Sequence, residues 1–226
     1  MSALVARWDE VQRIAGYLVV CSLLTGCVAL PHPVTPDVSA THQVEVFHSV
    51  QLSPEANDTS TDFSKQVADL SDNIEIVDVT RLRDIAFADE DWNLDELMQP
   101  ATRQRIMEEL DLQYVVILGE LKRTYNDDEG SFYIPFVVGA VAGEELSSLS
   151  AIIVDLKEGE AISKIDSVAH STQRLFIYVI VAVGNMPLTR SSAIKGLAEE
   201  TARIFDDIAE SKTLRIAVIN ERQEDP

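Results

Sequence analysis

Positive charge, aromatic side chains and cysteine are all scarce in this sequence. Its 18 Lys and Arg residues face 38 Asp and Glu residues, so the formal net charge is −20. This balance argues against a nucleic-acid binder, because phosphate recognition depends on Lys and Arg. Only 6% of the residues are aromatic, which disfavours a protein that stacks bases. The 46% of hydrophobic residues in a chain of 226 nevertheless suffice for a folded core.

Recognisable catalytic and metal-binding motifs are also missing. The chain has no H-E-x-x-H, C-x-x-C, G-x-S-x-G, Walker or G-x-G-x-x-G pattern. His42, Glu45 and His48 could converge on a metal ion, and the acidic runs 89–91 and 127–129 could offer oxygen ligands to calcium, but strand positions and solvated loops explain such residues more simply. We therefore expect no catalytic residue, no metal site and no cofactor.

The first thirty residues carry the features of an export signal. Arg7 and Arg13 precede an eleven-residue uncharged run, Ile14–Leu24. As a helix this run would be ~16 Å long at ~1.5 Å per residue, well short of a hydrocarbon core of ~30 Å. Its length and flanks are typical of the apolar region of a secretory signal peptide, which we expect to be removed as residues 1–26.

A four-residue motif ends this segment: Leu24, Thr25, Gly26 and Cys27. It resembles the lipobox of bacterial lipoproteins. The resemblance implies cleavage between Gly26 and Cys27, with diacylglyceryl and acyl groups attached covalently to Cys27. Cys21 leaves with the signal peptide, so the mature chain keeps no free thiol. Val28 is not acidic, which in that family implies an outer-membrane anchor. We expect the folded part in the periplasm, and leave a surface-facing orientation open.

The next segment has the composition of a linker. Residues 27–43 contain Pro31, Pro33 and Pro36, and no Lys or Arg lies between Arg13 and Lys65. We expect an extended tether that reaches at most ~50 Å at ~3.3 Å per residue. Because the tether has no polybasic patch, we expect the acyl chains alone to hold the protein at the bilayer.

Residues 44–220 alternate between strand and helix patterns. Period-two and β-branched runs predict strands, apolar residues at helical spacing predict helices, and Gly159 marks a hairpin turn. The strands are expected over 44–52, 74–79, 114–118, 150–156, 161–168 and 214–219, and the helices over 62–70, 94–110 with a restart at Pro100, and 194–208. We expect residues 122–131 to form a polar insertion and residues 221–226 a polar tail. The pattern predicts one α/β (α+β) domain with a mixed sheet, helices packed on it, and a long amphipathic C-terminal helix before the last strand.

Residues 93–168 resemble the α/β module shared by the curli-secretion lipoprotein, the amino-terminal domain of the Tol-system periplasmic protein, and lipoprotein activators of cell-wall synthases. The resemblance rests on a helix that leads into the strand YVVIL, and on Tyr114, Gly119, Asp155 and Gly159. It implies a non-enzymatic accessory protein of the cell envelope. It transfers no catalytic residue.

Two apolar runs leave alternatives open. Pro135, Gly139 and Gly143 suggest a loop or an irregular edge strand within 132–143, and 175–183 is expected to be a core strand. Either run could instead form an exposed docking patch for an envelope partner. The residues we expect in such a patch are Phe136, Val137, Ile177 and Val179.

These observations lead to one function hypothesis and two rivals. The first is a lipid-anchored accessory protein that binds an unidentified envelope protein, with homo-oligomers left open. An oligomeric secretion or pore-associated lipoprotein would instead place 132–143 or 175–183 in the membrane. A hydrolase would need a carboxylate site around Asp155.

Overall fold

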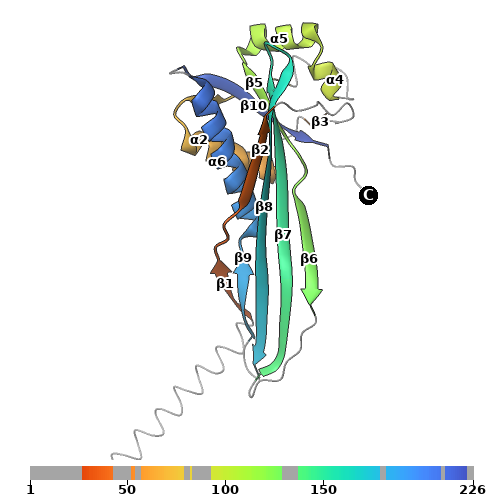
Figure 1. Ribbon diagram of the computed structural model, residues 1–226, viewed down its shortest axis with the longest axis vertical. Helices are drawn as coiled ribbons and strands as arrows, with labels where there is room; N and C mark the ends of the chain where they lie inside the picture. Colours follow the sequence, from red (N-terminus) through yellow and green to blue (C-terminus); the bar gives the residue numbers. More distant parts are fainter. Residues whose placement is uncertain are drawn as a thin grey trace, which may run out of the picture. The chain divides into compact units, whose positions relative to one another are not determined.

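The computed structural model describes residues 27–42, 52–53, 57–78, 82, 93–128, 137–178, 182–209 and 212–222. Strands and helices alternate along the chain, and Figure 1 shows their arrangement. The strands are β1 (Cys27–His32), β2 (Asp37–His42), β3 (Leu52–Ser53), β4 (Ile74–Ile76), β5 (Tyr114–Leu118), β6 (Lys122–Asp128), β7 (Val137–Asp155), β8 (Glu160–Tyr178), β9 (Ala182–Pro187) and β10 (Leu214–Glu221). The helices are α2 (Asp58–Leu70), α4 (Leu94–Leu97), α5 (Pro100–Leu110) and α6 (Thr189–Ala209).

These strands form one mixed sheet. Its main path runs β1-β9-β8-β7-β5-β10-β3, while β2 pairs with β8, β4 with β10 and β6 with β7. The β1–β9, β4–β10 and β5–β10 pairs are parallel, whereas β2–β8, β5–β7 and β8–β9 are antiparallel. The mixed sheet, its packed helices, and the long helix α6 followed by the last strand β10 confirm the predicted α/β fold.

The chain divides into two compact units, which we describe separately. Unit 1 takes its described residues from 27–34, 124–145 and 171–188, and it contains β1 and β9 with parts of β6, β7 and β8. Unit 2 takes its residues from 35–123, 146–170 and 189 onward, and it contains the helices and the remaining strands.

Alternation along β5 and β10 builds the core of unit 2 in three layers. In β5, Val116 and Leu118 join the cluster formed with α2 and α6, whereas Val115 and Ile117 join the cluster formed with α4 and α5. Side chains alternate across a strand, so a continuous apolar run supplies both faces. In β10, likewise, Ile216 and Val218 belong to the first cluster and Ala217 and Ile219 to the second. Both strands are therefore buried on both faces, which the run YVVIL predicted for β5.

Small residues allow α6 to approach the sheet closely. A Cβ on Gly196 would lie 2.6 Å from the Pro36 side chain and 2.8 Å from that of Val38, which flank and form β2. On β8 the residues buried on one side include Ser163 and Ser167, whose hydroxyls have no hydrogen-bond partner among the described residues. Larger side chains at these positions would push the helix away, so the serines fit a packing role.

Polar caps set where the helices begin. Asn57 caps α2 reciprocally with Ser60, since Asn57 Oδ1 accepts from Ser60 N at 2.8 Å and Ser60 Oγ accepts from Asn57 N at 3.0 Å. Asn93 Oδ1 caps α4 by accepting a hydrogen bond from Glu96 N at 2.8 Å, and Pro100 occupies the first turn of α5, as predicted. The predicted start of α2 at residue 62 was too late, because the pattern-based prediction overlooked the Asn57 cap.

Several predicted segments were wrong. Residues 27–42 are not a free tether, because β1 pairs with β9 and β2 with β8. The polar insertion contains β6, which pairs with β7. Glu221, placed in the tail, is the last residue of β10. These segments lack an apolar alternation but satisfy main-chain groups by pairing with other strands.

The two apolar runs were also misassigned. The run 175–183 is not one strand, since β8 ends at Tyr178 and β9 begins at Ala182, with Phe176 opposite Val183 in the antiparallel pair. The described part of 132–143 is the regular beginning of β7, which has neighbours on both sides, rather than a loop or an edge strand. The strand predicted from residue 44 lies outside the described residues except for Leu52 in β3.

Helix α2 offers a matched test of the core. Phe63 is fully buried between α2 and α6, whereas Leu70, the last residue of α2, is 46% exposed. We expect Phe63→Ala to lower the free energy of unfolding by about 3–5 kcal/mol and Leu70→Ala by less than about 0.5 kcal/mol. Urea unfolding followed by circular dichroism measures both. Equal losses from the two variants would contradict the packing of α2.

Candidate functional site

The turn between β7 and β8 is held by a network that reaches to α5. Asp155 Oδ1 accepts hydrogen bonds from the backbone of Lys157 at 2.8 Å and Glu158 at 3.1 Å. Gly159 has a φ of 77°, a backbone conformation that residues other than glycine rarely adopt. Arg103 of α5 lies over this glycine, and its Nη1 donates to the carbonyl of Leu156 at 2.7 Å. The turn is thereby fixed against α5.

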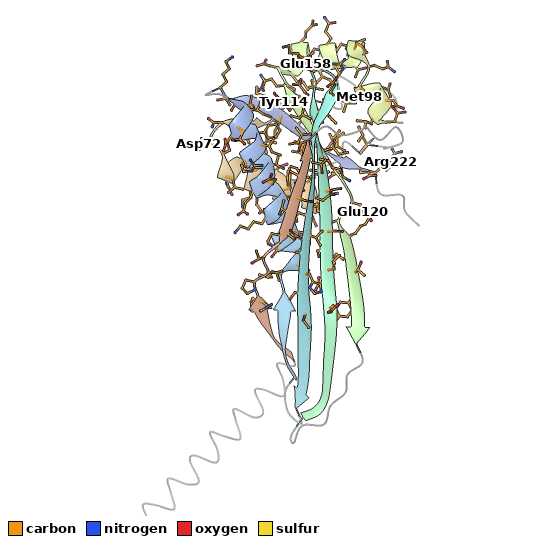
Figure 2. The ribbon with its side chains drawn as sticks, in the orientation of Figure 1. Asp72, Met98, Tyr114, Glu120, Glu158 and Arg222 are labelled. Carbon is orange, nitrogen blue, oxygen red and sulfur yellow. The ribbon has the colours of Figure 1, made fainter. Side chains whose placement is uncertain are left out.

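Tyr114 lies next to this turn at the start of β5. It is in register with Asp155, and its ring packs on Phe205 of α6 with centroids 5.4 Å apart. Burial, and secondarily the charge of Asp155, raise the pKa of the Tyr114 hydroxyl. Figure 2 shows Tyr114, Glu158 and Met98 near the end of unit 2 that carries α5. Of the residues that carried the family resemblance, Asp155 and Gly159 form the hairpin turn, and Tyr114 lies opposite Asp155 and packs on α6.

Gly119 follows β5 at the edge of a cavity, where the backbone lies close to β7. Its N–H donates to the Ser150 carbonyl at 2.9 Å, and a Cβ added to it would collide with the Ser150 hydroxyl. The adjoining cavity has a volume of about 340 Å³. It is lined by Glu120, Lys122, Ser148, Leu149, Ser150, Lys164, Asp166, Ser167, Val168, Glu221 and Arg222.

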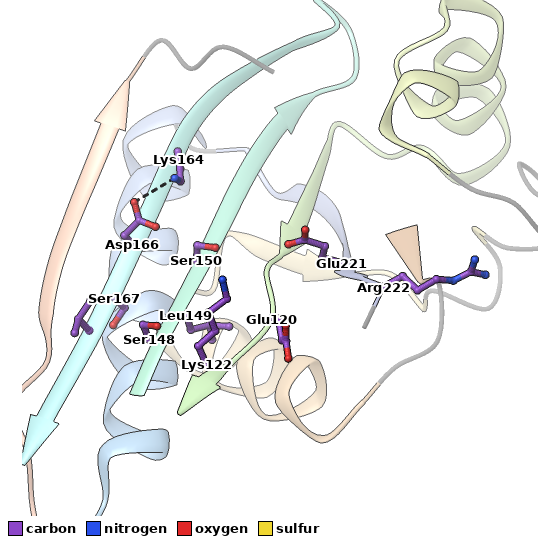
Figure 3. A pocket seen from close by; sticks show the side chains of 11 residues that line it. Glu120, Lys122, Ser148, Leu149, Ser150, Lys164, Asp166, Ser167, Glu221 and Arg222 are labelled. Atoms are coloured by element: carbon purple, nitrogen blue, oxygen red, sulfur yellow. Dashed lines mark ion pairs between the residues drawn. The ribbon is translucent and has the colours of Figure 1, made fainter. Parts of the chain in front are cut away.

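Polar and charged side chains make up most of the lining of this cavity. Ser148 and Ser150 are half-buried and alternate along β7 with Leu149 and Ala151, which are buried under α2 and α6, so the two serines lie on the opposite face. Lys164 and Asp166 form an ion pair at 3.6 Å (Figure 3). Hydroxyls, ammonium groups and carboxylates together suit a polar, hydrogen-bonding ligand or a polar protein surface. The lining contains no His or Cys to serve as base or nucleophile.

A second hollow lies at the beginning of α2. It has a volume of about 510 Å³ and is lined by Asp58, Thr59, Thr61, Asp62 and Arg190. Arg190 Nη1 forms an ion pair with Asp62 Oδ2 at 3.0 Å. Two carboxylates at a helix N-terminus already satisfy the positive end of the helix dipole, so this hollow is poorly suited to an anion.

The structure places few of the predicted site residues. Cys27 is the first residue of β1, and Leu24, Thr25 and Gly26 lie outside the described residues. Phe136 and Val179 also lie outside them, whereas Val137 begins β7 and Ile177 lies near the end of β8. The proposed docking patch therefore stays a prediction.

Most of the candidate metal ligands also lie outside the described residues. Glu45, His48 and the acidic run 89–91 lie outside the described residues. Within the described part of the chain, no group of three His, Cys, Asp or Glu side chains is placed to hold a metal ion. No helix there is long and apolar enough to cross a membrane.

Comparison with known proteins adds no relative. Neither the protein-family models nor the curated proteins that we searched match this chain.

Sequence reasoning missed the cavity and Arg103. The alternation of Ser148 and Ser150 with apolar residues, and of Lys164 and Asp166 with Ile165, was a usable signal for a polar face on the predicted hairpin. No local pattern links Arg103 to the turn, because its partner Leu156 is 53 residues away.

The Tyr114 environment predicts a pH dependence. Because the folded-state pKa of Tyr114 is raised, its contribution to stability is present below about pH 10 and is lost as the pH rises through the folded-state pKa. We expect Tyr114→Phe to flatten the fall in stability above about pH 10, and Asp155→Asn to lower the pKa of Tyr114. Urea midpoints against pH and ultraviolet titration of the phenolate measure these effects. Identical alkaline profiles for wild type and Tyr114→Phe would contradict the assignment.

Proposed function

We propose that this chain is an outer-membrane-anchored periplasmic lipoprotein that acts as a non-enzymatic, partner-binding accessory protein of the cell envelope. The observation that carries this proposal is the motif Leu24–Cys27 after an uncharged run too short to span a bilayer. Acylation of Cys27 provides the anchor, since two or more acyl chains hold a protein stably at a membrane.

The roles of the described polar residues support binding over chemistry. Asp155, the residue around which a hydrolase site was considered, uses its carboxylate to hold two backbone amides of a turn. The cavity beside Gly119 offers opposite charges and hydroxyls. Such a surface recognises a polar partner through hydrogen bonds and charge complementarity.

Unit 1 offers a second kind of contact surface. Three large hydrophobic residues are exposed among the described residues, and two of them, Tyr125 (49%) and Leu188 (38%), belong to unit 1. Exposed aromatic and aliphatic side chains of this kind are common anchors in protein interfaces. We therefore place the partner contact on unit 1 as well.

An oligomeric secretion or pore-associated lipoprotein is the second candidate, and the strand edges of unit 1 favour it. Within the described chain, β1 pairs only with β9 and β6 only with β7. Among the described strands, each therefore lies at an edge of the sheet, and an edge strand is a template for pairing with another chain. Pairing of β6 in one copy with β1 in the next would be a heterologous contact, which builds a ring or a filament.

The lipid anchor has a direct test. We expect cells expressing the full chain to incorporate labelled palmitate into the mature protein, and Cys27→Ser to abolish this incorporation because the thiol that forms the thioether is lost. Val28→Thr serves as the matched control and should incorporate palmitate normally. Continued incorporation by Cys27→Ser would contradict the proposal.

Cross-linking in intact cells separates the two candidate functions. We expect a photoreactive amino acid at Tyr125, which is on β6, to yield a discrete adduct with a different envelope protein. The same group at Asp207, on the exposed side of α6, is the control and should yield no such adduct. A ladder of adducts containing only this chain would favour the oligomeric candidate over the accessory one.

A further inference from the structure

The strand register in unit 1 fixes the position of the residue that we propose to be acylated. Cys27 of β1 lies opposite Ala182 of β9, and Ala182 lies opposite Ile177 of β8. Two further rows follow across the same three strands: Val28, Val183 and Phe176, then Ala29, Gly184 and Leu175. Figure 1 shows that β1 and β9 begin, and β8 ends, at the same end of the strands of unit 1.

This end of unit 1 is built from uncharged segments of four strands, β1, β7, β8 and β9. No Asp, Glu, Lys or Arg occurs in β1, in β9, in the last four residues of β8 or in the first seven of β7. By contrast, 25% of the residues of the whole chain are charged. A water-exposed surface of this protein would be expected to share its high charge. The lack of charged residues in these segments therefore favours surroundings other than water.

Because of this pairing, no free tether separates the proposed anchor at Cys27 from the folded protein. A free tether would add up to ~3.3 Å for each residue after Cys27. Since Cys27 itself is paired with β9, the acyl chains leave the protein directly from the sheet.

We infer that the end of unit 1 formed by Cys27–Ala29, Leu175–Ile177 and Ala182–Gly184 rests on the membrane, at the boundary between lipid headgroups and acyl chains. This inference rests on the proposed acylation of Cys27. The uncharged rows provide an apolar contact beside the acyl chains, and the two together hold unit 1 against the bilayer without electrostatic attraction.

Site-directed fluorescence on the acylated protein tests this contact. Cys27 is consumed by the lipid, so a single cysteine introduced by Ile177→Cys or Val183→Cys can carry an NBD label in the full-length protein, reconstituted in phosphatidylethanolamine and phosphatidylglycerol vesicles. Ser39→Cys on β2, an exposed position, is the matched control. We expect nitroxide groups on the lipid chains to quench the labels at 177 and 183 by roughly twofold or more, and to leave the label at 39 unchanged.

Each other outcome overturns the inference in a recognisable way. Acylated protein whose labels at 177 and 183 are unquenched would contradict the membrane contact and leave the lipid anchor standing. Labels shielded from water, unquenched by lipid and cross-linked between copies would assign this surface to a second copy of the chain. Mass spectrometry that finds no lipid on Cys27 would remove the premise, and with it the proposed function.

Discussion

The main-chain pairing of β1 with β9 determines where a membrane anchor on this protein can lie. In most linker-like segments rich in proline the chain is solvated, and the distance between anchor and domain varies. Here Cys27 is opposite Ala182, so the acyl group that we propose on Cys27 would be attached to the sheet itself. Among the described strands, the same pairing leaves β1 at an edge of the sheet. An edge strand that begins at the proposed anchor is a template on which a second copy of the chain could pair.

Unit 2 obeys a different constraint, which is the burial of both faces of β5 and β10. Their alternating side chains join α2 and α6 on one side and α4 and α5 on the other. The hairpin of β7 and β8 is then fixed by Arg103, which binds the carbonyl of Leu156 at the turn. The polar cavity lies where this apolar packing gives way to Ser148 and Ser150.

The elements that sequence reasoning predicted correctly are those with a strong local signal. YVVIL in β5, the cap at Asn93 with the restart at Pro100, and the apolar stripe of α6 all carry their structure in a few neighbouring residues. The errors arose where pairing with another strand decides the structure: a distant strand for β1 and β2, and the next strand along the chain for the polar β6. The apolar run from Leu175 was misleading because one buried strand and the ends of two paired strands have the same composition.

Hydrogen exchange of β1 in the mature, acylated protein tests the central claim most directly. Alternate amides between Val28 and His32 are expected to exchange slowly, because they bond to β9 in a parallel pair. Amides that exchange throughout this segment as fast as an unstructured peptide would show that Cys27 begins a free tether, and would contradict both the register and the membrane contact inferred from it.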